Sequence, residues 1–126
     1  MSEYSAAVLA HFREPRGAGR LPEGSPGTAC GEARDDEGGQ RVRLYLRIGP
    51  GERIERARFQ AFGCPIAIAV ASAAVVRFEG ATLPEALALR ADELARELAL
   101  TPEQARLAEL PLAALRAGLA YLRPRS

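Results

Sequence analysis

The chain has 126 residues, 48% of them apolar, which is enough to bury the core of one globular domain. Its 17 basic residues, all arginine, balance 16 acidic ones, so a net charge of +1 gives no overall attraction to nucleic acid or to an anionic membrane. Two cysteines without a recognisable signal peptide favour a reducing cytoplasm over a disulfide framework. We therefore expect one cytoplasmic domain over residues 1–126, with no membrane span.

The first part of the chain predicts a helix and a loop. Residues 2–12 carry apolar side chains at helical spacing, with Ser2 or Ser5 as the cap, and predict a short amphipathic helix. Residues 13–40 are rich in glycine and proline and have no hydrophobic period, so we expect a long, mobile loop. Loops of that length are uncommon in compact domains unless they have a function or are disordered.

Two amphipathic strands follow the loop. Residues 41–48 alternate apolar side chains with arginines and a tyrosine, a pattern typical of a strand with one face in water. After a turn at Gly49-Pro50-Gly51, residues 54–62 alternate again, with Ile54 on the face opposite Phe59. The two strands predict an antiparallel hairpin.

The remainder of the chain predicts helices. Residues 65–79 are apolar on nearly all sides, which is typical of a helix buried in the centre of its domain, and Pro65 suits its first position. Further helices are expected over residues 82–89, 92–98 and 101–122. The order of elements predicts an α+β fold, in which a small antiparallel sheet packs against several helices.

Both cysteines are candidate functional residues. Cys64 begins the buried helix, where unpaired N–H groups and the helix dipole stabilise a thiolate, but a small buried cysteine can equally serve packing alone. Cys30 lies in a glycine-rich stretch, two residues before Glu32. Together Cys30, Glu32 and Cys64 offer three of the four ligands that a tetrahedral metal site needs. His11 is interpreted as a surface or capping residue rather than a ligand.

Other patterns are less specific. Arg41, Arg43 and Arg47 form a basic stripe on the open strand face, which is either simply solvated or receives an acidic partner; no aromatic platform for nucleic acid accompanies it. The chain contains no phosphate-binding loop, dinucleotide fingerprint, Ser-His-Asp set or zinc-protease motif, so we predict no enzyme activity.

Two longer stretches carry a family resemblance over nearly the whole chain. The opening Tyr4-Ser5, Val8, His11-Phe12, Pro15-Arg16 and Gly19 is similar to Y-S-x-x-V-x-x-H-[YF]-x-x-P-R-N-x-G. The later Ile54-Glu55-Arg56-Ala57-Arg58-Phe59 and Phe62-Gly63-Cys64 are similar to I-x-D-A-R-F-x-[TA]-[YF]-G-C. The chain thereby resembles the IscU and NifU N-terminal scaffolds of iron–sulfur cluster assembly, which implies their SufE/NifU-type α+β fold.

The resemblance implies a site. In that family, three cysteines, and an aspartate two residues after the first, bind a [2Fe-2S] cluster or zinc. Cys64 matches the second cysteine, and Cys30-Gly31-Glu32 is similar to the first C-G-D, with glutamate for aspartate. The third, H-C-[SA], falls on Arg106-Leu107-Ala108, so its ligands are missing. The spacing from Cys30 to Cys64 exceeds that of the family, and another gap placement puts C-G-D on Gly38-Gly39-Gln40.

The function implied is that of a divergent scaffold, which accepts sulfur or holds a labile [2Fe-2S] cluster through Cys64 with Cys30 and Glu32. Zinc or iron are the alternative metals. The partners implied are a cysteine desulfurase, assembly chaperones and apo-protein recipients, and two protomers of a homodimer could pool their cysteines. Two alternatives remain: a metal-free binding module that regulates a cysteine desulfurase, and a zinc-binding or thiol redox protein.

Overall fold

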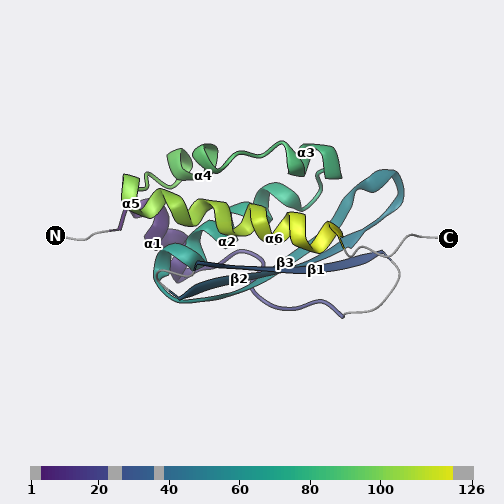
Figure 1. Cartoon of the computed structure of the whole chain (residues 1–126), viewed down its shortest axis with the longest axis horizontal. Helices are drawn as coiled ribbons and strands as arrows, with labels where there is room; N and C mark the ends of the chain where they lie inside the picture. The colour runs from purple at the N-terminus through teal and green to yellow at the C-terminus, as the bar shows by residue number, and fades with distance from the viewer. Residues whose placement is uncertain (1–3, 23–26, 36–38, 121–126) are drawn as a thin grey trace.

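The protein folds as a three-stranded antiparallel sheet, in the order β1-β2-β3, with helices covering one of its faces (Figure 1). The computed structural model describes residues 4–22, 27–35 and 39–120. Its helices and strands are α1 (Ala6–Arg13), β1 (Thr28–Asp35), β2 (Gln40–Ile48), the 3-10 turn η1 (Pro50–Glu52), β3 (Ile54–Phe62), α2 (Pro65–Phe78), α3 (Leu83–Leu87), α4 (Ala91–Glu97), α5 (Pro102–Ala105), the 3-10 turn η2 (Arg106–Ala108) and α6 (Glu109–Ala120). The predicted α+β class is confirmed.

The predicted hairpin is confirmed as β2 and β3, but its alternation is interrupted. Arg47 pairs with Arg56 while Ile48 pairs with Ile54, so Glu55 is an extra residue in β3. Such a bulge shifts the pattern by one position. Ile54 is therefore buried on the same side as Phe59, and the prediction that they lie on opposite faces was wrong.

The prediction of one long loop over residues 13–40 was also wrong, because β1 lies inside that range. Strand β1 pairs along its whole length with β2, from Thr28 opposite Arg47 to Asp35 opposite Gln40. A second stretch pairs with the outer edge of β3, where Gly19 N donates to Phe59 O at 2.8 Å and Phe59 N donates to Gly17 O at 2.9 Å. These segments have no hydrophobic period of their own, so tertiary pairing decides their structure.

Small residues in β1 allow a helix to approach closely. A Cβ added to Gly31 would lie 2.1 Å from the carbonyl oxygen of Ala114 and 2.3 Å from the backbone nitrogen of Gly118, both in α6. Helix α6 packs on β1 and β2, while α2 packs on β3 and is buried along most of its length. The helix predicted over residues 65–79 is thus confirmed as the central helix α2.

The helix predicted over residues 101–122 is interrupted. Thr101 caps α5 in a capping box with Gln104, as its sequence predicts, but the chain then tightens into η2 before α6 begins. The reason is Pro111, which has no N–H to donate and whose ring crowds the carbonyl one turn earlier. Residues 121–122 lie outside the described residues.

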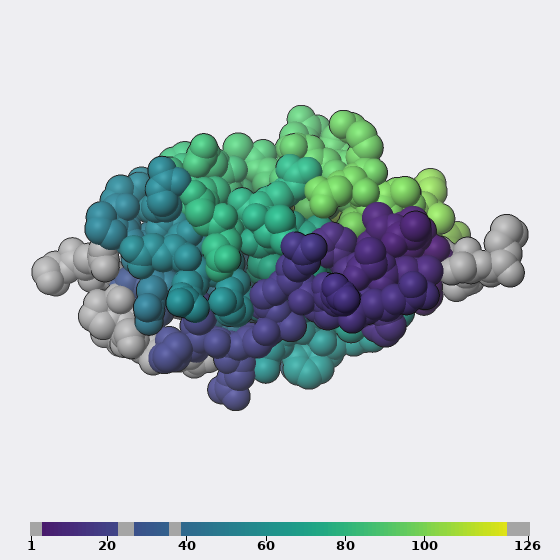
Figure 2. All heavy atoms as spheres, turned by 180° about the vertical axis from the view of Figure 1, so that it is seen from behind, coloured from purple at the N-terminus to yellow at the C-terminus, as the bar shows by residue number. Residues whose placement is uncertain are grey.

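Helix α1 and the segment after it fasten the central helix. Ser5 caps α1, its hydroxyl accepting from Val8 N at 3.1 Å, while Phe12 near the end of the helix is 41% exposed. Figure 2 shows this N-terminal segment, in purple, across the face of the molecule seen from behind.

Within the described parts of the chain, the helices are too short or too polar to cross a membrane.

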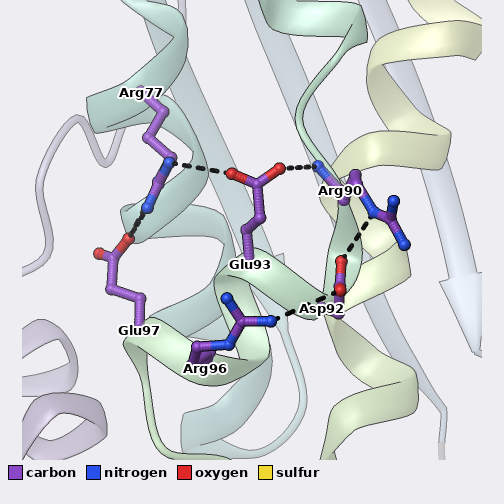
Figure 3. Close-up of polar contacts among 6 residues, drawn as sticks. All are labelled: Arg77, Arg90, Asp92, Glu93, Arg96 and Glu97. Carbon is purple, nitrogen blue, oxygen red and sulfur yellow. Dashed lines mark hydrogen bonds and ion pairs between the residues drawn. The ribbon is translucent and has the colours of Figure 1, made fainter.

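Helix α4 is held to α2 by ion pairs. Arg77 of α2 contacts Glu97 at 2.7 Å and Glu93 at 3.8 Å, and Glu93 also accepts from Arg90 N at the start of α4 (Figure 3). These side chains are partly exposed, so each pair contributes little to stability by itself.

Candidate functional site

Cys64 stands at the junction of the sheet and the central helix. It is the N-cap of α2, directly after the turn at Gly63 that follows β3, and it is half-buried against the core. Its side chain makes no capping hydrogen bond, while its carbonyl oxygen accepts from Ala67 N at 3.0 Å. Gly63 has φ +125°, which favours glycine. The thiol is therefore held at the N-terminal end of a buried helix.

Cys30 and Glu32 lie elsewhere on the sheet. Cys30 pairs with Tyr45, whereas Phe62, two residues before Cys64, pairs with Arg41. Those two rows are four positions apart along β2, which is about 13 Å along the strand. The structure therefore does not bring Cys30 to Cys64, and neither cysteine forms a disulfide.

Glu32 is surrounded by arginines. Its carboxylate lies 3.5 Å from Arg34, 3.8 Å from Arg41 and 3.5 Å from Arg43. Cys30, Glu32 and Cys64 thus do not converge, and no group of three metal-binding side chains occurs within residues 4–22, 27–35 and 39–120.

Different residues meet at the Cys64 end of the sheet. A Cβ on Gly63 would lie 2.6 Å from the Cγ of Gln40, so the turn before Cys64 touches the start of β2. This contact favours the alignment in which C-G-D falls on Gly38-Gly39-Gln40, of which Gly38 lies outside the described residues. A cleft of about 380 Å³ opens beside this turn, lined by Arg34, Asp35, Gly39, Gln40, Arg41 and Phe62.

An ion pair lies where the family resemblance places the third cysteine. Arg106 in η2 contacts the carboxylate of Asp35 at 2.5 Å, and it joins the helical layer to the end of β1. The next residue, Leu107, is buried in the core. Sequence reasoning located Arg106 but missed Asp35, because the two residues are 71 positions apart and no local pattern links them.

His11 is part of a structural link rather than of this site. Its Nδ1 lies 2.7 Å from the hydroxyl of Ser72, which is fully buried in α2 and also accepts from Arg16 N at 2.8 Å. Burial lowers the pKa of His11, and the carboxylate of Glu97 opposes this effect in part. The histidine therefore helps to position the helix that begins at Cys64.

Comparison with solved structures defines the class of fold. The SUF-system scaffold candidate FiSufU of Fervidobacterium islandicum AW-1 is similar over 93% of this chain and 96% of its own, with a TM-score of 0.76 and 18% identity. The N-terminal part of a nitrogen-fixing NifU-like protein from Brucella abortus is similar over 90% and 87%, with a TM-score of 0.67 and 19% identity. The fold is therefore that of the NifU and SufU type.

Sequence comparison then gives the family. The model of the NifU-like N terminal domain matches residues 3–126, and the chain belongs to this family. The iron-sulfur cluster assembly scaffold protein IscU of Azotobacter vinelandii is 35% identical over 79% of this chain and 77% of its own length. IscU of Escherichia coli K12 is 30% identical over 93% and 91%. The mitochondrial iron sulfur cluster assembly protein 1 of Schizosaccharomyces pombe is 36% identical over 79%, which spans about half (52%) of that protein.

Proposed function

We propose that this protein is a divergent scaffold or carrier of iron–sulfur cluster assembly, rather than an enzyme, and that Cys64 is its sulfur-accepting residue. One observation carries the proposal: a thiol without a capping hydrogen bond stands at the N-terminus of the buried helix α2. Its family membership supports the assignment, because relatives at 30–36% identity are named as scaffolds or assembly proteins.

The proposed step needs a single thiol. The Cys64 thiolate attacks the outer sulfur of a persulfide on a cysteine desulfurase, a new S–S bond forms to Cys64, and the bond to the donor cysteine breaks. The donor leaves as a thiolate, so the terminal sulfur and its charge pass to this chain without a further oxidant or reductant.

Holding a cluster is the more demanding part of the proposal. Cluster iron prefers thiolate ligands, and the described residues at this end of one protomer offer only Cys64. We therefore propose that a labile [2Fe-2S] cluster is held, as cargo, only when two protomers pool their Cys64 thiolates or when a small thiol adds a ligand. Cys30 and Glu32 have no part in this version, because they belong to a separate row of the sheet.

Reconstitution under anaerobic conditions tests the proposal. Incubation with iron, cysteine and a cysteine desulfurase should add sulfur to the protein and give visible absorbance, and Cys64→Ala should lose both. Cys30→Ala is the matched control and should retain the added sulfur. A wild-type protein that stays colourless and gains no sulfur would refute the proposal.

A second candidate is a metal-free module that binds a cysteine desulfurase and regulates it. The ion pair between Arg106 and Asp35 favours this candidate, because Arg106 stands where the family resemblance places the missing His-Cys ligands. A desulfurase complex that persists when both cysteines are replaced by serine, with altered desulfurase turnover, would support this candidate. Loss of the complex in that variant would count against it.

The cytoplasmic location stays a prediction, since the relatives include bacterial proteins and a mitochondrial one.

A further inference from the structure

Three arginines gather on the sheet face that the main helices leave open. The strand register places Arg34 and Arg41 in one row with Phe62, and Arg43 in the next row with Glu32. Paired residues point to the same face of a sheet. The neighbouring positions Val42 and Leu44 point the other way and are buried, so the arginines face away from α2 and α6 (Figure 1). We call Arg34, Arg41 and Arg43 the arginine patch.

The arginine patch concentrates positive charge at one place on the sheet. Among the residues that the structure describes, Glu32 is the carboxylate in ion-pair contact with all three arginines, so three cations meet one anion there. Asp35 lies at the edge of the same cleft, but its carboxylate is bound by Arg106 at 2.5 Å. Within the described part of the chain, the patch therefore holds more positive than negative charge, which favours an acidic ligand.

The guanidinium groups are held in place before any partner binds. Arg41 lies over the ring of Phe62, 4.3 Å from its centroid, and Arg43 Nε donates to the hydroxyl of Tyr45 at 2.9 Å. The Nε of Arg41 is buried and has no hydrogen-bond partner within the described part of the chain. Because these two guanidinium groups are already ordered, less conformational entropy is lost when a ligand binds to them.

We propose that the arginine patch binds an acidic peptide segment of a protein partner, whose carboxylates enter the cleft between Arg34 and Arg41. Arginine forks match carboxylates, and Phe62, 46% exposed, offers an apolar contact beside them. Stacked bases fit less well, because Arg41 covers the Phe62 ring and Tyr45 is only 3% exposed. This assignment of the partner rests on the proposed function, in which a cysteine desulfurase supplies sulfur to Cys64. Because the cleft adjoins the turn to Cys64, we assign the acidic segment to that sulfur donor.

Peptide binding tests the patch without any sulfur chemistry. The probe is a fluorescent peptide of alternating Glu and Leu, compared with its Gln counterpart by anisotropy at low salt. Arg41→Glu and the more exposed Arg34→Glu should each weaken binding of the acidic peptide by about tenfold or more. Arg56→Glu is the control, since it makes the same charge change at an exposed position of the same face. Equal losses in Arg41→Glu and Arg56→Glu, or tighter binding of a single-stranded RNA of equal charge, would overturn the proposal.

Two further measurements separate this inference from the proposed function. Cys64→Ser should bind the acidic peptide as the wild type does, although it accepts no sulfur. In sulfur transfer from a cysteine desulfurase, Arg34→Glu should raise KM severalfold and leave kcat nearly unchanged. An unchanged KM in a variant that no longer binds the peptide would overturn the assignment of the segment to the sulfur donor.

Discussion

The turn that precedes Cys64 depends on Gly63, so Gly63→Ala is the most informative change near the site. At φ +125° a side chain strains the backbone, at about 1–3 kcal/mol. The new Cβ would also lie 2.6 Å from Cγ of Gln40 and 3.1 Å from its Cα. The Cγ atom can move aside, whereas the backbone atom has to shift by a few tenths of an ångström. Displacing the two adds about 1 kcal/mol, for a total loss of unfolding free energy of about 2–4 kcal/mol.

Gly80→Ala is the matched control. Gly80 has φ +88° with nothing within 4 Å of the added Cβ, so its replacement should cost only backbone strain, about 1–2 kcal/mol. Urea unfolding measures both variants, and iodoacetamide alkylation of Cys64 should change in rate only in Gly63→Ala. Adding Gln40→Ala should recover part of the loss. A Gly63→Ala protein that is no less stable than Gly80→Ala, with unchanged alkylation, would refute this account of the turn.

Three further predictions concern the fold around the site. The ion pair between Asp35 and Arg106 should give a coupling energy of about 1 kcal/mol in a double-mutant cycle to Asn and Gln, decreasing in high salt, and zero coupling would contradict its role as a link. His11 has its pKa lowered below the usual 6.5, so the unfolded chain takes up its proton first. Between about pH 7.5 and about pH 5.5 the wild type should therefore lose more stability than His11→Gln, and parallel profiles would refute this. Gly31→Ala meets backbone atoms and should cost at least about 3 kcal/mol in urea unfolding, clearly more than Gly118→Ala, whose nearest contact is 3.1 Å.

The sequence predicted those elements whose side chains carry a clear period or cap. Helix α2 follows from an apolar run that begins at Pro65, and β2 from its strict alternation. Strand β1 has small residues on its buried side, Ala29 and Gly31, because α6 lies so close. That selection for size removes the hydrophobic signal by which strands are recognised.

The sequence predicted the position of Cys64 in the fold, but not the contacts around it. The sequence around Cys64 contains both the turn glycine and the first-position proline, so the helix-terminal thiol could be located locally. The contacts around it, Asp35 with Arg106 and Gly63 with Gln40, join segments far apart in the chain. Cys30 had a plausible motif around it, but strand pairing decides its location, and no spacing rule could reveal that.

The central claim, that Cys64 is the sulfur acceptor, is tested most directly by locating the transferred sulfur. After anaerobic incubation with a cysteine desulfurase and cysteine, the protein is alkylated, digested and mapped by mass spectrometry. We predict one added sulfur on the peptide that contains Cys64 and none on the peptide that contains Cys30, with the same result in Cys30→Ser. Sulfur found on Cys30 alone, or the same yield in Cys64→Ser, would contradict the account.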